Sequence, residues 1–190
     1  MKLRSVTSIL IFLILVNCME KAKVNDPTEE ALAYLKTLLP RHNQLTKAKV
    51  NELEGISFAG TTITDDKLKY LLVFPNLDNL TLTKTKITDV GLDMFRDSKI
   101  RSLDIDGTLV TNKAIKILKD WKHLKILNIS YTNIDDGAVE DLLKLKVDLI
   151  AAGTKLSEKA IERLRKKMSV ETEEYTMQCL GMETSKCPEF

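Results

Sequence analysis

The apolar residues in the central part of this chain recur in one short pattern, and the pattern is written five times. In the clearest copy Leu77, Leu80 and Leu82 are separated by polar residues, and the last two show the two-residue period of a half-buried strand. Further along the same copy, Leu92 and Phe95 have the spacing of one face of a helix. Each copy therefore predicts a short strand followed by a helix.

The five copies keep a common register across residues 53–164. Each has a threonine after its strand, and these turn threonines are Thr61, Thr85, Thr108, Thr132 and Thr154. They recur every 22 to 24 residues, and self-similarity at such a period indicates a solenoid. One strand and one short helix cannot bury their apolar sides alone, whereas stacked copies cover one another.

Two polar positions in each copy have predicted structural roles. We expect the turn threonines to bridge successive turns, because a hydroxyl both donates and accepts hydrogen bonds; the alternative is a set of surface turn residues. Thr88, which precedes Asp89, fits a helix N-cap followed by an acidic residue in the first turn. The equivalent cap positions in the other copies are Thr64, Thr111, Asp135 and Ser157.

The resemblance to a known family is carried by the second copy, which reads Leu77-x-x-Leu80-x-Leu82-x-x-Thr85-x-Ile87-Thr88-Asp89-x-Gly91-Leu92. It resembles a leucine-rich repeat of the helix-containing bacterial kind, with Thr where the commoner repeat has Asn or Cys. The resemblance covers residues 53–164. It implies an α/β solenoid with a curved parallel β-sheet on the concave side and helices on the convex side. It also implies a module that binds a protein, without identifying that protein.

Residues 1–17 have the proportions of a signal peptide, with a basic start and an apolar run too short to span a bilayer. The run ends in Leu15-Val16-Asn17-Cys18, which resembles a bacterial lipobox, although Asn17 departs from the small residue usual there. We expect cleavage before Cys18, lipidation of Cys18 and a lipid-anchored place in the bacterial cell envelope. The alternative is an ordinary secretory signal.

The segments on either side of the repeats have separate predicted roles. Residues 18–26 form a polar tether, and residues 27–52 form an N-terminal helical cap. Asp26-Pro27-Thr28-Glu29 predicts the start of the cap helix. Residues 165–190 are predicted to be a C-terminal cap or tail.

Cys179 and Cys187 remain in that tail when Cys18 is lipidated. In an exported protein two such cysteines favour a disulfide, while the alternative is a reactive or metal-binding pair. His42 and His123 have no third ligand in register, so the sequence predicts neither a metal site nor a cofactor.

The charges are nearly balanced, with 29 Lys and Arg against 27 Asp and Glu. The expected signal peptide contains two of the cations and none of the acids, so 27 of each remain. The charges are also interspersed, which argues against a nucleic-acid partner.

The stretch Asp104-Ile105-Asp106-Gly107-Thr108 resembles the Asp-x-Asp-Gly-Thr motif of haloacid-dehalogenase-type phosphatases. In those enzymes the first Asp attacks phosphorus, the second is an acid/base, and Mg²⁺ neutralises charge. Here the apolar residues of the stretch are explained by the repeat register, and no second acidic motif follows. We expect that the protein is not an enzyme. The minor alternative is a Mg²⁺-dependent phosphatase that uses Asp104 and Asp106.

The alternation along the strands predicts a concave face of small, mostly polar side chains with one aromatic residue. It lacks the aromatic rows of a sugar- or single-strand-binding platform. The candidate protein-binding residues on it are Thr81, Lys84, Asp104, Asp106, Asn128, Ser130 and Tyr131. Two alternatives stay open: a partner that docks on the helices or the cap, and a structural envelope protein that self-associates.

Overall fold

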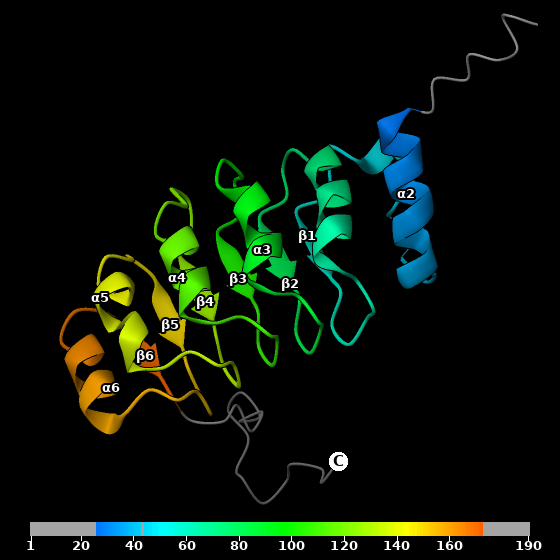
Figure 1. The fold of residues 1–190 in the computed structure, drawn as a ribbon. Coiled ribbons are helices and arrows are strands. Elements are labelled where there is room, and N and C mark those ends of the chain that lie inside the picture. The colour runs from blue at the N-terminus through cyan, green and yellow to red at the C-terminus, as the bar shows by residue number, and fades with distance from the viewer. Residues whose placement is uncertain (1–25, 43, 173–190) are drawn as a thin grey trace, which may run out of the picture.

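The computed structural model describes residues 26–42 and 44–172, and these residues stack as a solenoid (Figure 1). Six strands form one sheet in the order β1-β2-β3-β4-β5-β6, and each strand is parallel to its neighbours. The helices lie along one side of this sheet. The predicted fold class, an α/β leucine-rich-repeat solenoid, is confirmed by this arrangement.

The strands are short. They are β1 (Gly55–Ser57), β2 (Asn79–Thr81), β3 (Ser102–Asp104), β4 (Ile126–Asn128), β5 (Asp148–Ile150) and β6 (Val170–Glu171). The helical elements are α2 (Pro27–Leu38), η1 (Lys47–Lys49), η2 (Asp65–Val73), α3 (Asp89–Leu92), η3 (Asp93–Phe95), α4 (Asn112–Leu118), η4 (Asp136–Ala138), α5 (Val139–Leu142) and α6 (Glu158–Arg165). Those named η are 3₁₀ helices, so the outer side is built partly from this tighter helix.

The strand pairing confirms the register expected from the sequence. Leu80 pairs with Leu103, and Leu103 pairs with Leu127, so the inward apolar positions are aligned across the sheet. Two rows of residues then face away from the core. They are Gly55, Asn79, Ser102, Ile126 and Asp148, and Ser57, Thr81, Asp104, Asn128 and Ile150.

The core lies between the sheet and the helices. Leu127 and Ile129 of one repeat and Ile115 of the preceding helix are completely buried. Adjacent strands lie about 4.7–4.9 Å apart, whereas packed helices need about 8–10 Å. Each unit is therefore thinner at its strand than at its helix. Stacked units of this shape form a curved solenoid with the sheet on the inner, concave face.

The turn threonines close a turn within their own repeat. The hydroxyl of Thr85 donates to the carbonyl oxygen of Leu82 (2.6 Å), and Thr108 donates in the same way to Ile105 (2.7 Å). The same bond recurs at Thr61, Thr132 and Thr154. The prediction that these hydroxyls bridge successive turns is therefore wrong, because the tight turn presents an acceptor three residues back.

Successive repeats are joined instead at the starts of their helices. Asp65, the first residue of η2, accepts the backbone N–H of Thr88 (2.9 Å) and its hydroxyl (2.6 Å). Asp89 accepts the N–H and hydroxyl of Thr111, both at 2.8 Å. The first helical residue of one repeat thus binds the N-cap residue of the next. This helix-start ladder consists of the pairs Asp65–Thr88, Asp89–Thr111, Asn112–Asp135 and Asp136–Ser157.

The predicted N-caps are confirmed at four of the five positions. In each of the four the side chain accepts a backbone N–H of its helix, and the residues are Thr88, Thr111, Asp135 and Ser157. The prediction for Thr64 is wrong, because its hydroxyl donates to Asp66 (2.6 Å). Thr64 is the first cap of the series and has no earlier repeat to supply an acceptor.

The helix α2 stands at the N-terminal end of the stack (Figure 1). It begins as the sequence predicts, with the side chain of Asp26 accepting the N–H of Thr28 (2.9 Å). Leu32 and Leu35 are buried in the core. Tyr34 packs against Tyr70 of η2, with 5.1 Å between the ring centroids.

Four predictions lie outside the described residues, wholly or for the most part: the signal peptide, lipidation at Cys18, the tether, and a disulfide between Cys179 and Cys187. Within the described residues, no helix has both the length and the apolar character needed to cross a membrane.

Candidate functional site

The concave face extends into a rim, where the chain bends away from the sheet. The backbone N–H of Lys84 donates to the carbonyl oxygen of Asp106 (2.7 Å), and that of Gly107 donates to Ser130 (2.9 Å). Tyr131 continues the series by donating to Ala152 (2.8 Å). The sheet-like pairing therefore runs past the strands and holds the bends of successive repeats side by side.

The rim consists of the bend residues Gly60, Lys84, Gly107, Tyr131 and Gly153, and all five have a left-handed backbone. Lys84 has φ of 54° and Tyr131 has φ of 52°, where the other repeats use glycine. A left-handed conformation costs a residue with a Cβ roughly 1–2 kcal/mol. Two repeats therefore have a residue with a large side chain in a strained backbone conformation. A glycine at the same position would adopt this conformation at a lower free-energy cost.

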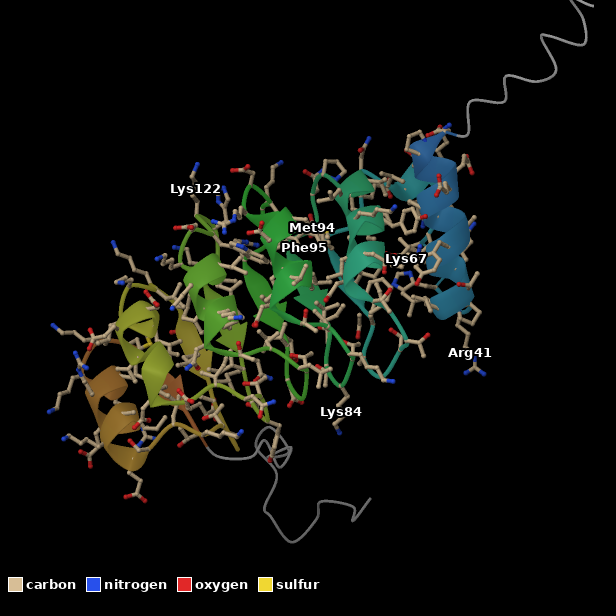
Figure 2. The ribbon with its side chains drawn as sticks, viewed as in Figure 1. Arg41, Lys67, Lys84, Met94, Phe95 and Lys122 are labelled. Carbon is tan, nitrogen blue, oxygen red and sulfur yellow. The ribbon has the colours of Figure 1, made fainter. Side chains whose placement is uncertain are left out.

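Each large rim side chain lies over the glycine of the next repeat. A Cβ added at Gly107 would stand 3.2 Å from Cγ of Lys84. A Cβ at Gly153 would stand 2.5 Å from Cε1 of Tyr131, which is too close for any residue but glycine. The small rim residue is thus a packing requirement at Gly153, whereas a Cβ at Gly107 would require only a small shift of the Lys84 side chain. Figure 2 shows Lys84 projecting from the molecule at the edge opposite Lys122.

Asp104 and Asn128 have equivalent structural roles at the ends of their strands. Oδ1 of Asp104 accepts the N–H of Asp106 (3.0 Å), and Oδ1 of Asn128 accepts the N–H of Ser130 (3.0 Å). Both side chains satisfy a backbone donor where the chain leaves the regular strand pairing. The two residues still face the concave side, and the second oxygen of Asp104 is not used by this turn.

Asp106 lies in a less favourable environment. Its Oδ1 is buried and has no hydrogen-bond partner within the described part of the chain. Burial raises the pKa of its carboxyl group, the negative charge of Asp104 raises the pKa further, and the positive charge of Lys84 lowers it. An unsatisfied buried acceptor costs free energy, so the fold holds this oxygen at a cost to its stability.

Ser130 must be removed from the candidate contacts. Its side chain is only 4% exposed, and its hydroxyl oxygen accepts the N–H of Ala152 (3.1 Å). The expectation that Ser130 lies open on the concave face is therefore wrong. Its position follows the regular strand, and the turn there directs the hydroxyl toward the neighbouring repeat.

Ile126 is a surface residue that the candidate set omits. It is 43% exposed on β4, and Tyr131 at the end of the same repeat is 48% exposed. Ile150 of β5 is half-buried on the same face. The signal was in the sequence, since an apolar residue at an outward strand position has no role in the core. The concave side thus combines apolar groups on the later strands with Asp104 and Asp106 on the middle repeat.

The phosphatase-like stretch is part of the ordinary repeat. Leu103, Ile105 and Thr108 are buried in the positions that the register assigns to them. Among the described residues, no group of three or more His, Cys, Asp or Glu side chains is placed to hold a metal ion.

An all-parallel sheet with helical segments on one face and repeats in register defines the class of the protein, which is a leucine-rich-repeat solenoid. Modules of this class present an extended concave surface for binding.

No protein-family model matches the chain, and no curated protein matches its sequence. Among solved structures, the chain is similar to internalin C2 from Listeria monocytogenes, with 20% sequence identity and a TM-score of 0.46. The similarity covers 75% of this chain and 73% of the internalin chain.

Proposed function

We propose that the protein is a binding module that receives a protein ligand on its concave face, and that a lipid at Cys18 tethers it to a bacterial cell envelope. The observation that carries the proposal is the left-handed backbone of Lys84 and Tyr131 on the rim. Residues with a strained backbone cluster at ligand-binding positions, where the contribution of the side chain to binding offsets its conformational cost.

The concave face offers a ligand two kinds of contact. Tyr131 and Ile126 supply exposed apolar area, and tyrosine is frequent among the residues that dominate binding energy. Asp104 and Asp106 supply carboxyl groups beside that area, and burial and the negative charge of Asp104 raise the pKa of Asp106. A ligand that presents a Lys or Arg next to an apolar side chain fits both contacts.

Within residues 26–42 and 44–172, the architecture leaves this face available. The helical segments cover the other face of the sheet, so a ligand contacts the concave side without disturbing the core. The helix α2 begins at Pro27, nine residues after Cys18 in the sequence, so the proposed lipid would join the chain on the side of α2 rather than of the last repeat.

The binding proposal is tested by capture of proteins from bacterial envelope and extracellular extracts, followed by mass spectrometry. Tyr131→Gly removes the ring and relieves the left-handed backbone, and thermal unfolding of the variant, measured beside the binding, separates a lost contact from lost stability. Asp104→Asn with Asp106→Asn keeps the acceptor of the turn and removes the charge. We expect a protein that the wild type retains and that these variants lose.

The matched control is on the helical side, where Lys116→Ala and Lys119→Ala alter exposed residues of α4 and its end. Ligand retention should be unchanged in this control. If the helical-side variants lose the ligand and the variants at Tyr131, Asp104 and Asp106 keep it, the binding surface is on the convex face and the proposal fails.

The lipid tether has its own test. Metabolic labelling with a fatty acid should mark the wild-type chain and should not mark Cys18→Ser. Equal labelling of the two chains would refute the lipid anchor and would leave the binding proposal untouched.

A further inference from the structure

One position on the helical side of the stack holds a large side chain in three repeats and a serine in another. The position follows each helical segment, and its backbone N–H donates to the carbonyl oxygen of a buried residue three places back. Its occupants are Phe74, Ser98, Trp121 and Leu145. The three large side chains are buried, whereas Ser98 is half-buried. The serine therefore leaves space that the large side chains fill in the other three repeats.

A hollow of about 270 Å³ opens beside Ser98. Met94 and Phe95 form part of its wall on the helical side of the molecule (Figure 2). Phe74 and Leu72 of the preceding repeat contribute further apolar wall, and Leu72 is 54% exposed. Pockets for drug-sized ligands usually measure about 300–1,000 Å³, so this hollow suits a single side chain.

The hydroxyl of Ser98 does not explain why a small residue is present. Its oxygen is shielded from solvent and has no hydrogen-bond partner in the part of the chain that the structure describes. An unsatisfied buried polar group costs free energy, and unfilled space between apolar side chains costs more. Ser98 is thus less favourable to the fold than the residues at the equivalent positions.

We propose that the hollow receives a phenylalanine side chain from an acidic segment of a protein partner. An aromatic ring suits this wall, because Phe74 and Phe95 can pack against it edge to face. The sulfur of Met94 adds a favourable contact with a ring edge. The guest ring would occupy space that a large side chain of the chain itself fills in other repeats.

The charges around the hollow favour an acidic partner. The loops 96–101 and 119–125 together carry six cations against two acids, which are Arg96, Lys99, Arg101, Lys119, Lys122 and Lys125 against Asp97 and Asp120. Asp97 and Lys99 both line the hollow. Nζ of Lys99 bonds to the amide oxygen of Asn76 (3.1 Å) and has no ion pair within the described residues. A glutamate beside the inserted phenylalanine can therefore pair with Lys99.

Trp121 provides the measurement, because it is the only tryptophan of the chain. Its ring meets Phe95 edge-on, with 6.1 Å between the centroids, and Phe95 lines the hollow. The probe is a blocked tripeptide with phenylalanine between two glutamates, titrated into the full chain while tryptophan fluorescence is recorded. We expect a saturable change. A probe with alanine for phenylalanine should bind about tenfold more weakly, and one with lysines for the glutamates about fivefold more weakly.

Ser98→Leu should have two opposite effects. It fills the hollow as Leu145 fills the equivalent position, so the thermal midpoint should rise by about 2–4 °C. The same side chain excludes the guest ring, so the probe should bind about tenfold more weakly. Ser169→Leu is the matched control, because it makes the same substitution at an exposed position. This control should change neither the midpoint nor the affinity.

If Ser98→Leu does not fold, Leu72→Gln tests the same wall at an exposed position and should also weaken binding of the probe. The proposal is overturned if both variants bind the probe as the wild type does, or if the three tripeptides bind equally. It is also overturned if light scattering shows a wild-type dimer that Ser98→Leu abolishes, because a second copy would then fill the hollow. Tyr131→Gly should bind the probe normally, so a failure here leaves the concave-face proposal in place.

Discussion

The helix-start ladder and the rim both recur once in every repeat, yet their chemistry differs. The ladder uses nearly the same pair each time, an acidic or amide side chain against a capping hydroxyl or carboxylate. The rim alternates glycine with Lys84 and Tyr131, two side chains of unlike chemistry. Positions that are the same in every repeat stabilise the stack. Positions that differ between repeats, and that carry a residue less favourable to the fold than glycine, indicate a role in recognition.

The largest effect should come from the uniform core beneath both features. Leu127→Ala removes a completely buried side chain of β4 and should lower the free energy of unfolding by about 2–5 kcal/mol. Asn128→Ala, one residue on, should cost only about 1 kcal/mol, the loss of its bond to the N–H of Ser130. Urea denaturation measures both values, and the reverse order would mean that the strand register is off by one.

A ladder position should have the next largest effect. Asp89 accepts hydrogen bonds from the N–H and hydroxyl of Thr111 and from the N–H of Ala114. Asp89→Ala should therefore cost about 1.5–3 kcal/mol, since bonds to a charged acceptor are lost. Asp93→Ala, in the same segment but exposed, is the control and should change the denaturation midpoint little. A similar loss in both variants would contradict a special role for the ladder.

A carboxyl group of the ladder and the carboxyl group of Asp106, which precedes the rim residue Gly107, should also differ in their response to pH. Hydrogen bonds from the backbone and hydroxyl of Ser157 lower the pKa of Asp136, so its stabilisation is present above the ordinary carboxyl pKa and is lost as pH falls through the lowered value. Burial raises the pKa of Asp106, so its contribution has the opposite sign and is lost as pH rises through the raised value.

Urea titrations at a series of pH values between about 3 and 7 measure this difference. Asp136→Asn should flatten the acid limb of the stability profile, and Asp106→Asn should improve stability at neutral pH relative to acid pH. Parallel profiles for the two variants would show that the carboxyl groups of Asp106 and Asp136 are in equivalent environments.

The smallest effect should come from the rim itself. Lys84→Gly relieves a left-handed backbone but increases the entropy of the unfolded chain, so the net gain should be only about 0.5 kcal/mol. Thermal unfolding measures the gain, with Lys86→Gly as a control at an exposed position without positive φ. A loss of stability in Lys84→Gly would mean that the Lys84 side chain contributes to the fold.

The fold was predictable because two periods, one of a strand and one of a helix, are repeated in a fixed register. That register placed Asp104, Asn128 and Ile126 on the correct face. Local hydrogen bonding was not predictable, because a threonine hydroxyl can satisfy either its own turn or a neighbouring one. The burial of Ser130 and the left-handed conformation of Tyr131 also depend on how the chain bends after the strand, where the two-residue period ends.

Because of the helix-start ladder, the number of repeats can change by whole units. Each unit supplies one acceptor to the unit after it and takes one from the unit before it, as Asp89 does for Thr111 and Asp65 does for Thr88. Inserting or deleting one whole unit between residues 65 and 157 therefore leaves each junction with a backbone N–H and an acceptor, although a deletion that brings Asp89 opposite Asp135 sets two carboxylates together. Gene segments that encode single units can be duplicated or lost in this region, and the concave surface becomes longer or shorter without a new core.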